Sequence, residues 1–157
     1  MVQKRYMYES GARIPLAVLT QISCAFLWAG LILGLSFIET PLKFQAPGVT
    51  REIGLGIGRL VFQTLNRIEI VLLVTMGISI FLSHTPSKVK VFFTVIAGIL
   101  LLQTFWLLPT LDARTQSLIS GVELPASVHH QVFIVVECTK LTLLILIGIL
   151  TGRKLHS

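Results

Sequence analysis

Residues 14–38 read IPLAVLTQISCAFLWAGLILGLSFI and contain no charged side chain. At about 1.5 Å per residue, a helix of this length crosses the roughly 30 Å of hydrocarbon in a bilayer. Three more apolar segments follow, and the predicted helices cover about 14–38, 53–83, 90–111 and 127–152. Only 13% of the 157 residues are charged, about half the share in a soluble domain. The sequence therefore predicts an all-α fold, an integral membrane four-helix bundle formed by one transmembrane domain over residues 1–157.

The links between the predicted helices are short, which favours an antiparallel up-down order. Prolines and glycines mark these links, and Pro109 is expected to end the third helix. Pairs of small residues four apart are expected to let helices approach closely. These pairs are Ala25/Ala29, Gly30/Gly34 and Gly54/Gly58.

The formal net charge of +6 reflects an excess of Lys and Arg. Many of them lie in the N-terminal tail, in the link between the second and third predicted helices, and in the C-terminal tail. In a membrane protein such residues concentrate on the cytoplasmic side, so the charge does not indicate a nucleic-acid partner. The first apolar segment lacks a signal-peptide cleavage site and is interpreted as a retained helix. Both termini are predicted to be cytoplasmic, because basic residues lie at Lys4, Arg5, Arg13, Lys88, Lys90, Arg153 and Lys154.

Polar side chains inside the second and fourth predicted helices are the main functional signal, because each charge within a bilayer needs a partner or a wet cavity. Glu69 and Glu137 lie at similar depths, about 22 Å from one end of their helices. We expect ion pairs from Arg67 to Glu137 and from Glu69 to Lys140. The alternative is that the charged groups extend separately to the membrane surface. The predicted binding or ion-pair cluster comprises Arg59, Asn66, Arg67, Glu69, His130, Glu137 and Lys140.

A second predicted cluster, at the outward ends of the helices, contains Glu39, Asp112, Arg114 and His129. Together with His130, its carboxylates and imidazoles could bind a transition metal or the edge of a haem. The alternative is helix capping in the headgroup region, since no ligand motif with a specific spacing is present. The sequence therefore assigns neither a metal nor a cofactor.

No catalytic motif supports an enzyme, and no catalytic residue is assigned. Ser117, Ser120 and Ser127 lie near histidines but lack a nucleophile motif such as G-x-S-x-G. The glycine-rich run at residues 54–58 follows no strand, which excludes a nucleotide-binding loop. Trp28 lies deep in the first segment and is expected to pack in the core.

Several spaced positions resemble a known family. They are Trp28-x-Gly30, Phe37-x-x-x-Pro41-x-x-Phe44, Leu108-Pro109-x-x-Asp112-x-Arg114, and His129/His130 at the start of the last helix. The pattern resembles the poorly characterised four-helix membrane family that includes the transmembrane protein associated with platinum-drug resistance. This resemblance implies an integral membrane protein that handles metal complexes or other small solutes.

Two function classes follow from these features. In the first, the chain binds or transports a small solute, such as an ion, a metal complex or a lipid headgroup, through a polar cavity open to the outer face. In the second, it is an accessory or assembly subunit of a larger membrane complex, because four short helices leave little room for an alternating-access transporter. The expected partners are the lipid bilayer and either a larger complex or further copies of the chain.

Overall fold

The computed structural model describes residues 15–122, 124–125 and 128–153, and every regular element in these ranges is helical. Four helical rods are long and apolar enough to cross a membrane: Leu16–Gln45, Arg51–Phe81, Ser87–Ile119 and Val128–Arg153. The predicted all-α four-helix bundle is confirmed at this level. In chain order the elements are α1 (Leu16–Leu31), η1 (Ile32–Glu39), α2 (Thr40–Leu42), η2 (Lys43–Gln45), α3 (Arg51–Phe81), α4 (Ser87–Leu102), η3 (Gln103–Leu107), α5 (Leu108–Ile119) and α6 (Val128–Arg153).

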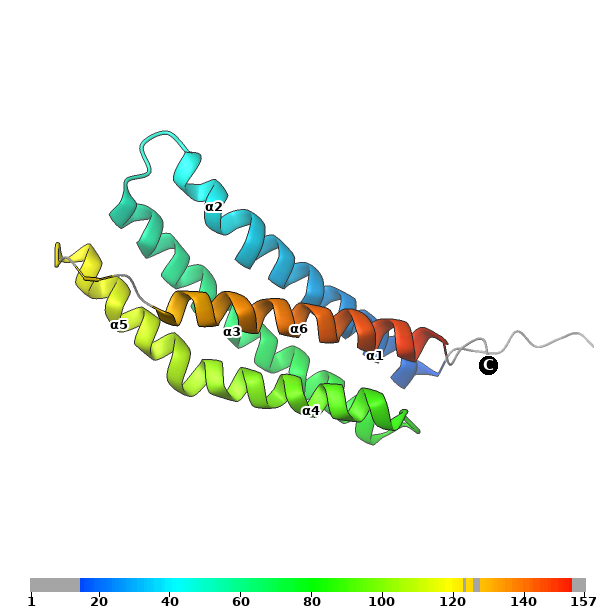
Figure 1. The fold of residues 1–157 in the computed structure, drawn as a ribbon. Helices are drawn as coiled ribbons and strands as arrows, with labels where there is room; N and C mark the ends of the chain where they lie inside the picture. The colour runs from blue at the N-terminus through cyan, green and yellow to red at the C-terminus, as the bar shows by residue number, and fades with distance from the viewer. Residues whose placement is uncertain (1–14, 123, 126–127, 154–157) are drawn as a thin grey trace, which may run out of the picture.

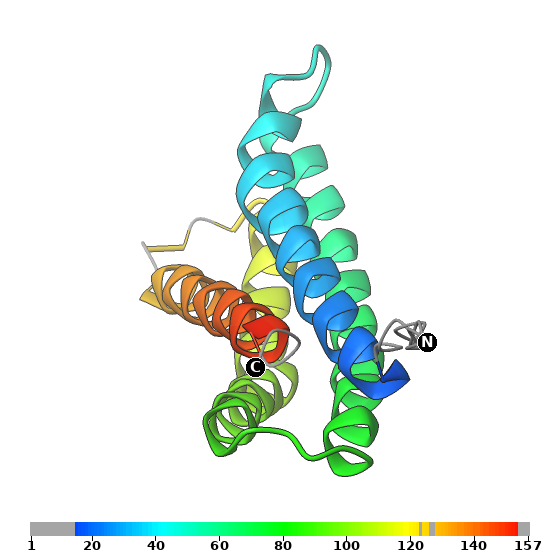
Figure 2. The same cartoon turned by 90° about the vertical axis from the view of Figure 1, so that its right-hand side faces the viewer.

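The rods lie side by side, and the links between them gather at two ends of the bundle (Figure 1). The link before α3, around Gly48, lies at the same end as the link between α5 and α6, and we call this the Gly48 end. The link between α3 and α4, around Thr85, marks the opposite Thr85 end. Figure 2 looks onto this end, where α1 begins and α6 finishes. α1 packs against α3 and α6, and α4 packs against the same two helices, so the rods enclose a common core.

Two rods continue through a proline at which the sequence predicts a stop. The first rod extends past residue 38 to Gln45, and the third extends past Pro109 to Ile119. A π-helical segment precedes each proline, η1 before Pro41 and η3 before Pro109. In an α-helix the proline ring clashes with the carbonyl four residues back. The wider π-helical turn moves that carbonyl away, so the predicted ends of these two helices are wrong.

The second rod begins where its sequence provides a cap and a tight turn. Val49 N–H donates to the Ala46 carbonyl across Pro47 and Gly48, at 3.2 Å. Gly48 has a φ of 81°, which the third residue of a type II turn requires and which glycine adopts without strain. Thr50 then accepts a hydrogen bond from Ile53 N–H as the N-cap of α3. The observed limits of α3 and α6 agree with the predicted 53–83 and 127–152 to within two residues.

The apolar core lies between α1, α3, α4 and α6. Trp28 is fully buried in it, as the sequence predicts, and belongs to one packed cluster with Met76, Ile96, Leu144 and Ile147. These side chains come from all four rods, so packing of the core depends on all of them.

The three predicted pairs of small residues have different roles. Ala25 and Ala29 are buried in the core. Gly54 and Gly58 are also buried. A Cβ at Gly54 would lie 2.2 Å from the Phe44 ring, and a Cβ at Gly58 would lie 2.7 Å from Lys43 Nζ. Gly30 and Gly34 have no atom within 4 Å of such a Cβ, so the prediction of close helix packing at this last pair is wrong.

Gln21 links α1 to the α3–α4 link at the Thr85 end. Its buried Nε2 lies 2.8 Å from Ser83 Oγ, 3.1 Å from Thr85 Oγ1 and 3.2 Å from the Ser79 carbonyl oxygen. A buried amide at this position therefore satisfies acceptors on two other elements.

We predict that Gln21→Leu destabilises the fold by about 1 kcal/mol, because these acceptors lose a buried donor. The measurement is the thermal unfolding midpoint in detergent, followed by circular dichroism. Thr20→Val is the matched control, since Thr20 donates only to Leu16 within α1. Equal midpoints for the two variants would show that the Gln21 contacts do not stabilise this end.

Candidate functional site

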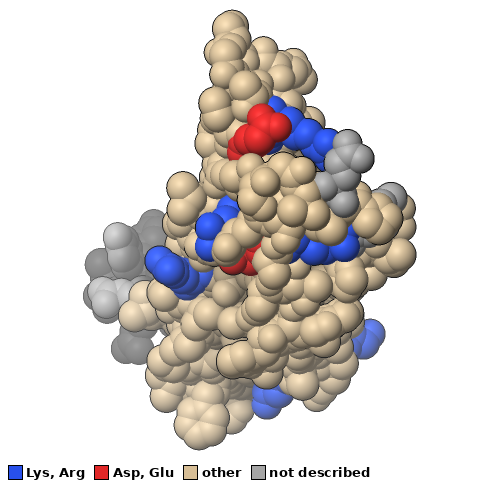
Figure 3. Space-filling view, turned by 90° about the vertical axis from the view of Figure 1, so that its left-hand side faces the viewer, with Lys and Arg blue, Asp and Glu red and all other residues tan. Residues whose placement is uncertain are grey.

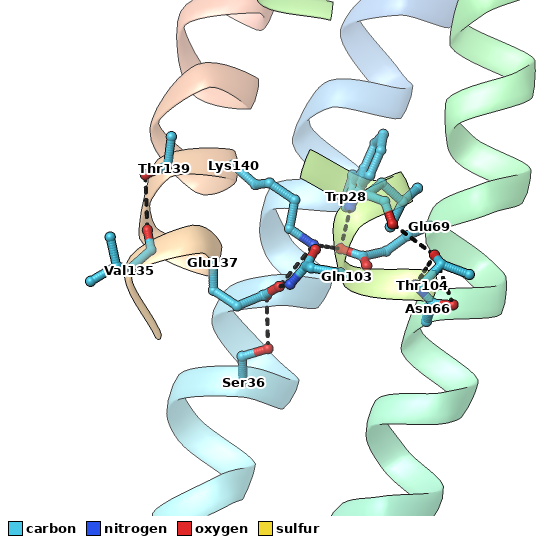
Figure 4. Close-up of polar contacts among 11 residues, drawn as sticks. Trp28, Ser36, Asn66, Glu69, Gln103, Thr104, Val135, Glu137, Thr139 and Lys140 are labelled. Carbon is cyan, nitrogen blue, oxygen red and sulfur yellow. Dashed lines mark hydrogen bonds and ion pairs between the residues drawn. The ribbon is translucent and has the colours of Figure 1, made fainter. Parts of the chain in front are cut away.

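A buried group of three charged side chains lies in the middle of the bundle. Lys140 Nζ on α6 is 2.6 Å from Glu69 Oε1 on α3 and 2.7 Å from Glu137 Oε1 on α6. The exposed fractions of Lys140, Glu69 and Glu137 are 0%, 2% and 1%. We call these three residues the Lys140 cluster (Figure 4).

Neutral polar side chains from the other elements donate to the two carboxylates. Trp28 Nε1 donates to Glu69 Oε1 at 2.7 Å. Gln103 Nε2 donates to Glu137 Oε1 at 2.8 Å, and Ser36 Oγ donates to Glu137 Oε2 at 3.0 Å. α1, η1, α3, η3 and α6 therefore all contribute to one hydrogen-bonded centre.

The local sequence explains why these groups meet. Glu137 and Lys140 are three residues apart, so they are neighbours on one face of α6. Ser36 and Gln103 lie in the π-helical segments η1 and η3, where the altered helical repeat changes the direction of side chains relative to an α-helix. Thr104, the next residue of η3, accepts a hydrogen bond from Asn66 Nδ2 on α3 at 3.0 Å.

Of the two predicted ion pairs, one is confirmed and one is wrong. Glu69 pairs with Lys140 as expected. Arg67 is exposed and forms no ion pair with any described residue, Glu137 included. Arg67 and Glu69 are two residues apart on α3, about 200° around the helix axis, so they cannot both face the core. Glu137 instead takes Lys140 as its partner.

A second charged group lies about 15 Å further along α3, towards the Gly48 end. Arg59 forms an ion pair with Asp112 on α5, with Nη2 3.1 Å from Oδ2. Gln63 and Gln116 donate to the same carboxylate, each at 3.0 Å. Arg59 thus belongs with Asp112, which the sequence analysis places in the other cluster.

A cavity of about 450 Å³ opens beside this pair at the Gly48 end, and we call it the Arg51 cavity. Figure 3 looks onto this end and shows Lys and Arg side chains spread around its centre with fewer acidic groups among them. The apolar part of the wall includes Phe44, Phe62, Phe133, Leu55, Leu108 and Leu111. The charged residues of the wall are Lys43, Arg51, Arg59, Arg114 and Asp112.

A smaller cavity of about 190 Å³, the Ser36 cavity, lies between the Arg51 cavity and the Lys140 cluster. It is lined by Ser36 and Glu137 at the cluster. Thr40, Phe62, His130 and Phe133 line both cavities. The rings of Phe62 and Phe133 meet edge to face with centroids 5.0 Å apart, so these aromatic side chains lie where the two cavities adjoin.

The predicted outer-face residues lie at the Gly48 end but do not form a single group. Glu39 pairs with Lys43 at 3.2 Å. Arg114 donates to the Pro125 carbonyl oxygen at 2.6 Å and lines the Arg51 cavity. His129 contacts the Trp106 ring with centroids 6.0 Å apart, whereas His130 lines the cavities. Among the described residues no three His, Cys, Asp or Glu side chains are arranged to hold a metal ion.

Sequence reasoning missed Ser36 and Gln103 at the cluster, and Lys43 and Arg51 at the Arg51 cavity. Gln103 is a lone amide in an otherwise apolar segment, which is a signal comparable to that of Glu137. The sequence predicts only a packing role for Trp28, but its indole N–H also donates to Glu69.

No protein family, curated protein or solved structure matches the chain. The family resemblance stays a prediction.

We predict that Lys140→Met destabilises the protein by about 3–5 kcal/mol, because two buried carboxylates lose their only cationic partner among the described residues. Adding Glu69→Gln to this variant restores part of the loss, since only one carboxylate then remains. Thermal unfolding midpoints in detergent provide the comparison. The exposed Lys88→Met is the control and is expected to match the wild type. A Lys140→Met midpoint equal to that of the control would contradict this account.

Proposed function

We propose that the chain is a four-span membrane protein, folded as an up-down antiparallel bundle, and that it binds a small amphiphile with an anionic headgroup in the Arg51 cavity. The observation that carries the proposal is the excess of positive charge around a cavity with apolar walls.

The outer surface of the rods supports the membrane assignment. Large apolar side chains project from all four rods, and Phe81 and Phe105 are 89% and 77% exposed. Apolar patches of this extent are rare on soluble monomers, whereas lipid chains cover them without cost. Lys88, Lys90 and Arg153 lie at the Thr85 end, together with the first residue of α1. The tendency of basic residues to stay inside supports a cytoplasmic location for this end, and we propose the same side for both termini. The predicted basic residues Lys4, Arg5, Arg13 and Lys154 lie outside the described residues.

The wall of the Arg51 cavity supports an anionic ligand. Four cationic side chains line it against the single carboxylate of Asp112. Arg59 is already paired with Asp112, and Lys43 with Glu39, whereas Arg51 and Arg114 form no ion pair with a described residue. Arginine binds phosphate and carboxylate groups with two parallel hydrogen bonds, which suits a lipid headgroup.

The size and the apolar wall support an amphiphile over a simple inorganic anion. A volume of about 450 Å³ falls within the range of small-molecule pockets. Phenylalanine and leucine side chains cover most of the wall, and such groups bind hydrocarbon in preference to water. A phosphate or carboxylate headgroup would contact Arg51 and Arg114, while part of the attached chain would lie against Phe44 and Phe62.

We predict selective retention of an anionic lipid. The protein is reconstituted in nanodiscs with equal phosphatidylglycerol and phosphatidylcholine, and native mass spectrometry measures the lipid that stays bound. Phosphatidylglycerol adducts are expected to dominate in the wild type. The double variant Arg51→Gln, Arg114→Gln is expected to lose most of this preference. Its affinity for phosphatidylglycerol is expected to fall roughly tenfold, which corresponds to a loss of about 1.4 kcal/mol of binding free energy.

The control removes the same amount of charge at the opposite end, through Lys88→Gln with Lys90→Gln. This control is expected to retain the lipid preference of the wild type. Equal retention of both lipids by the wild type would refute the proposal, and so would equal losses in the two double variants.

A second candidate, the accessory subunit, is favoured by one exposed face of α3. Arg67 lies in the middle of an exposed stripe whose members alternate three and four residues apart, the spacing of a helix-packing seam. An unpaired arginine among apolar side chains favours contact with a carboxylate on a partner helix. The stripe comprises Leu60, Thr64, Arg67, Val71, Val74, Ile78 and Phe81.

For this candidate we predict a larger assembly after gentle extraction from the native membrane, and its loss in Arg67→Leu. Native mass spectrometry gives the mass of the assembly. The Arg51→Gln, Arg114→Gln variant serves as the control, because it alters the cavity and leaves the stripe intact. A monomer in both the wild type and the control would rule out a permanent partner on this face.

A further inference from the structure

The Lys140 cluster has one more negative charge than positive charge. Two carboxylates, Glu69 and Glu137, share the single ammonium of Lys140. The other groups that donate to them are neutral. A further titratable group, His130, lines the Ser36 cavity together with Glu137. Neutral polar side chains surround the three charged residues of the cluster (Figure 4). They are Trp28 and Ser36 from the first rod, Asn66 from α3, and Gln103 and Thr104 from η3.

Burial makes this excess charge costly. All three charged side chains are at most 2% exposed, and they lie in the middle of rods that are apolar enough to span a bilayer. A net charge in such surroundings is strongly unfavourable, and a buried carboxylate usually avoids this cost by binding a proton.

The hydrogen-bond inventory indicates the same deficit independently. Gln103 Oε1 is buried and accepts no hydrogen bond from a described residue. Both hydrogen bonds that Glu69 accepts within the described part of the chain end on Oε1, so Oε2 is available to carry a hydrogen. The unsatisfied atom, Gln103 Oε1, is an acceptor, and the excess charge of the cluster is negative. A group that brings both a hydrogen to donate and a positive charge would therefore correct both deficits.

We propose that the Lys140 cluster is a binding site for one exchangeable proton, shared between Glu69 and Glu137. The proton forms an O–H bond with one carboxylate, and the cluster then has no net charge. Because both carboxylates contact the same ammonium, the proton belongs to the pair and not to either residue alone.

The Ser36 cavity provides the route by which this proton exchanges with solvent. Glu137 and Ser36 line its inner part, and His130 lines both this cavity and the larger Arg51 cavity. A cavity of about 190 Å³ has room for several waters, each of which occupies about 30 Å³ in the liquid. Proton exchange therefore occurs from the Gly48 end.

Infrared spectroscopy of the full chain in nanodiscs tests the proposal, because a protonated carboxylic acid has a carbonyl band distinct from that of a carboxylate. At neutral pH the wild type is expected to show this band, and the band is expected to shift in D₂O because the proton exchanges. Glu69→Gln and Glu137→Gln are each expected to lose the band entirely, since one carboxylate and one ammonium are already balanced.

Glu39→Gln is the matched control and is expected to keep the band, because Glu39 pairs with Lys43 outside the cluster. A wild type without the band overturns the proposal, whether or not the cluster then holds Na⁺ or K⁺. A band that persists in both cluster variants also overturns it, since the proton would then be on another group. If one variant fails to fold, the wild-type spectra and the other variant still decide the question.

Discussion

The contact of Lys140 with Glu69 and Glu137 is the interaction on which the rest of the structure depends. A charge at this depth is tolerated only with partners, and the partners come from every rod of the bundle. Trp28 brings α1 to Glu69, and Gln103 brings η3 to Glu137. In the proposed membrane setting, apolar packing does little to choose between alternative helix positions, because lipid chains are as apolar as leucine. The directional contacts to the Lys140 cluster therefore set how the four rods are rotated and aligned along their length.

The two π-helical segments connect the fold to the polar centre. η1 and η3 each precede a proline, and each contributes a side chain that donates to Glu137. The wider turn keeps each rod continuous through its proline, at Pro41 or Pro109. It also alters the helical repeat, so Ser36 and Gln103 are directed into the bundle. Single-turn π segments often occur at functional sites, and here they serve both the path of the chain and the chemistry of the cluster.

The balance of acidic and basic side chains differs between the middle of the bundle and the Gly48 end. In the middle of the bundle, two acids exceed one base and all three side chains are buried. Among the described residues that line the Arg51 cavity at the Gly48 end, four cationic side chains exceed one acid. The Ser36 cavity lies between these regions and shares the Phe62 and Phe133 rings with the larger cavity. The proposed anion site therefore adjoins the proposed proton site, and the proposed ligand of each site has the charge that its lining lacks.

The amino-acid sequence by itself determined the four apolar rods, the limits of α3 and α6, and the depth shared by Glu69 and Glu137, because hydropathy and helical rise are local properties. Residue spacing likewise sufficed to predict the pair between Glu69 and Lys140. Only the tertiary structure decided that Arg67 faces outward and that Arg59 pairs with Asp112. It also decided that Pro41 and Pro109 lie within continuous rods, and that Ser36 and Gln103 reach Glu137. The physical reason is that the rotation of each helix about its axis depends on contacts with neighbouring helices, which a pattern within one segment does not encode.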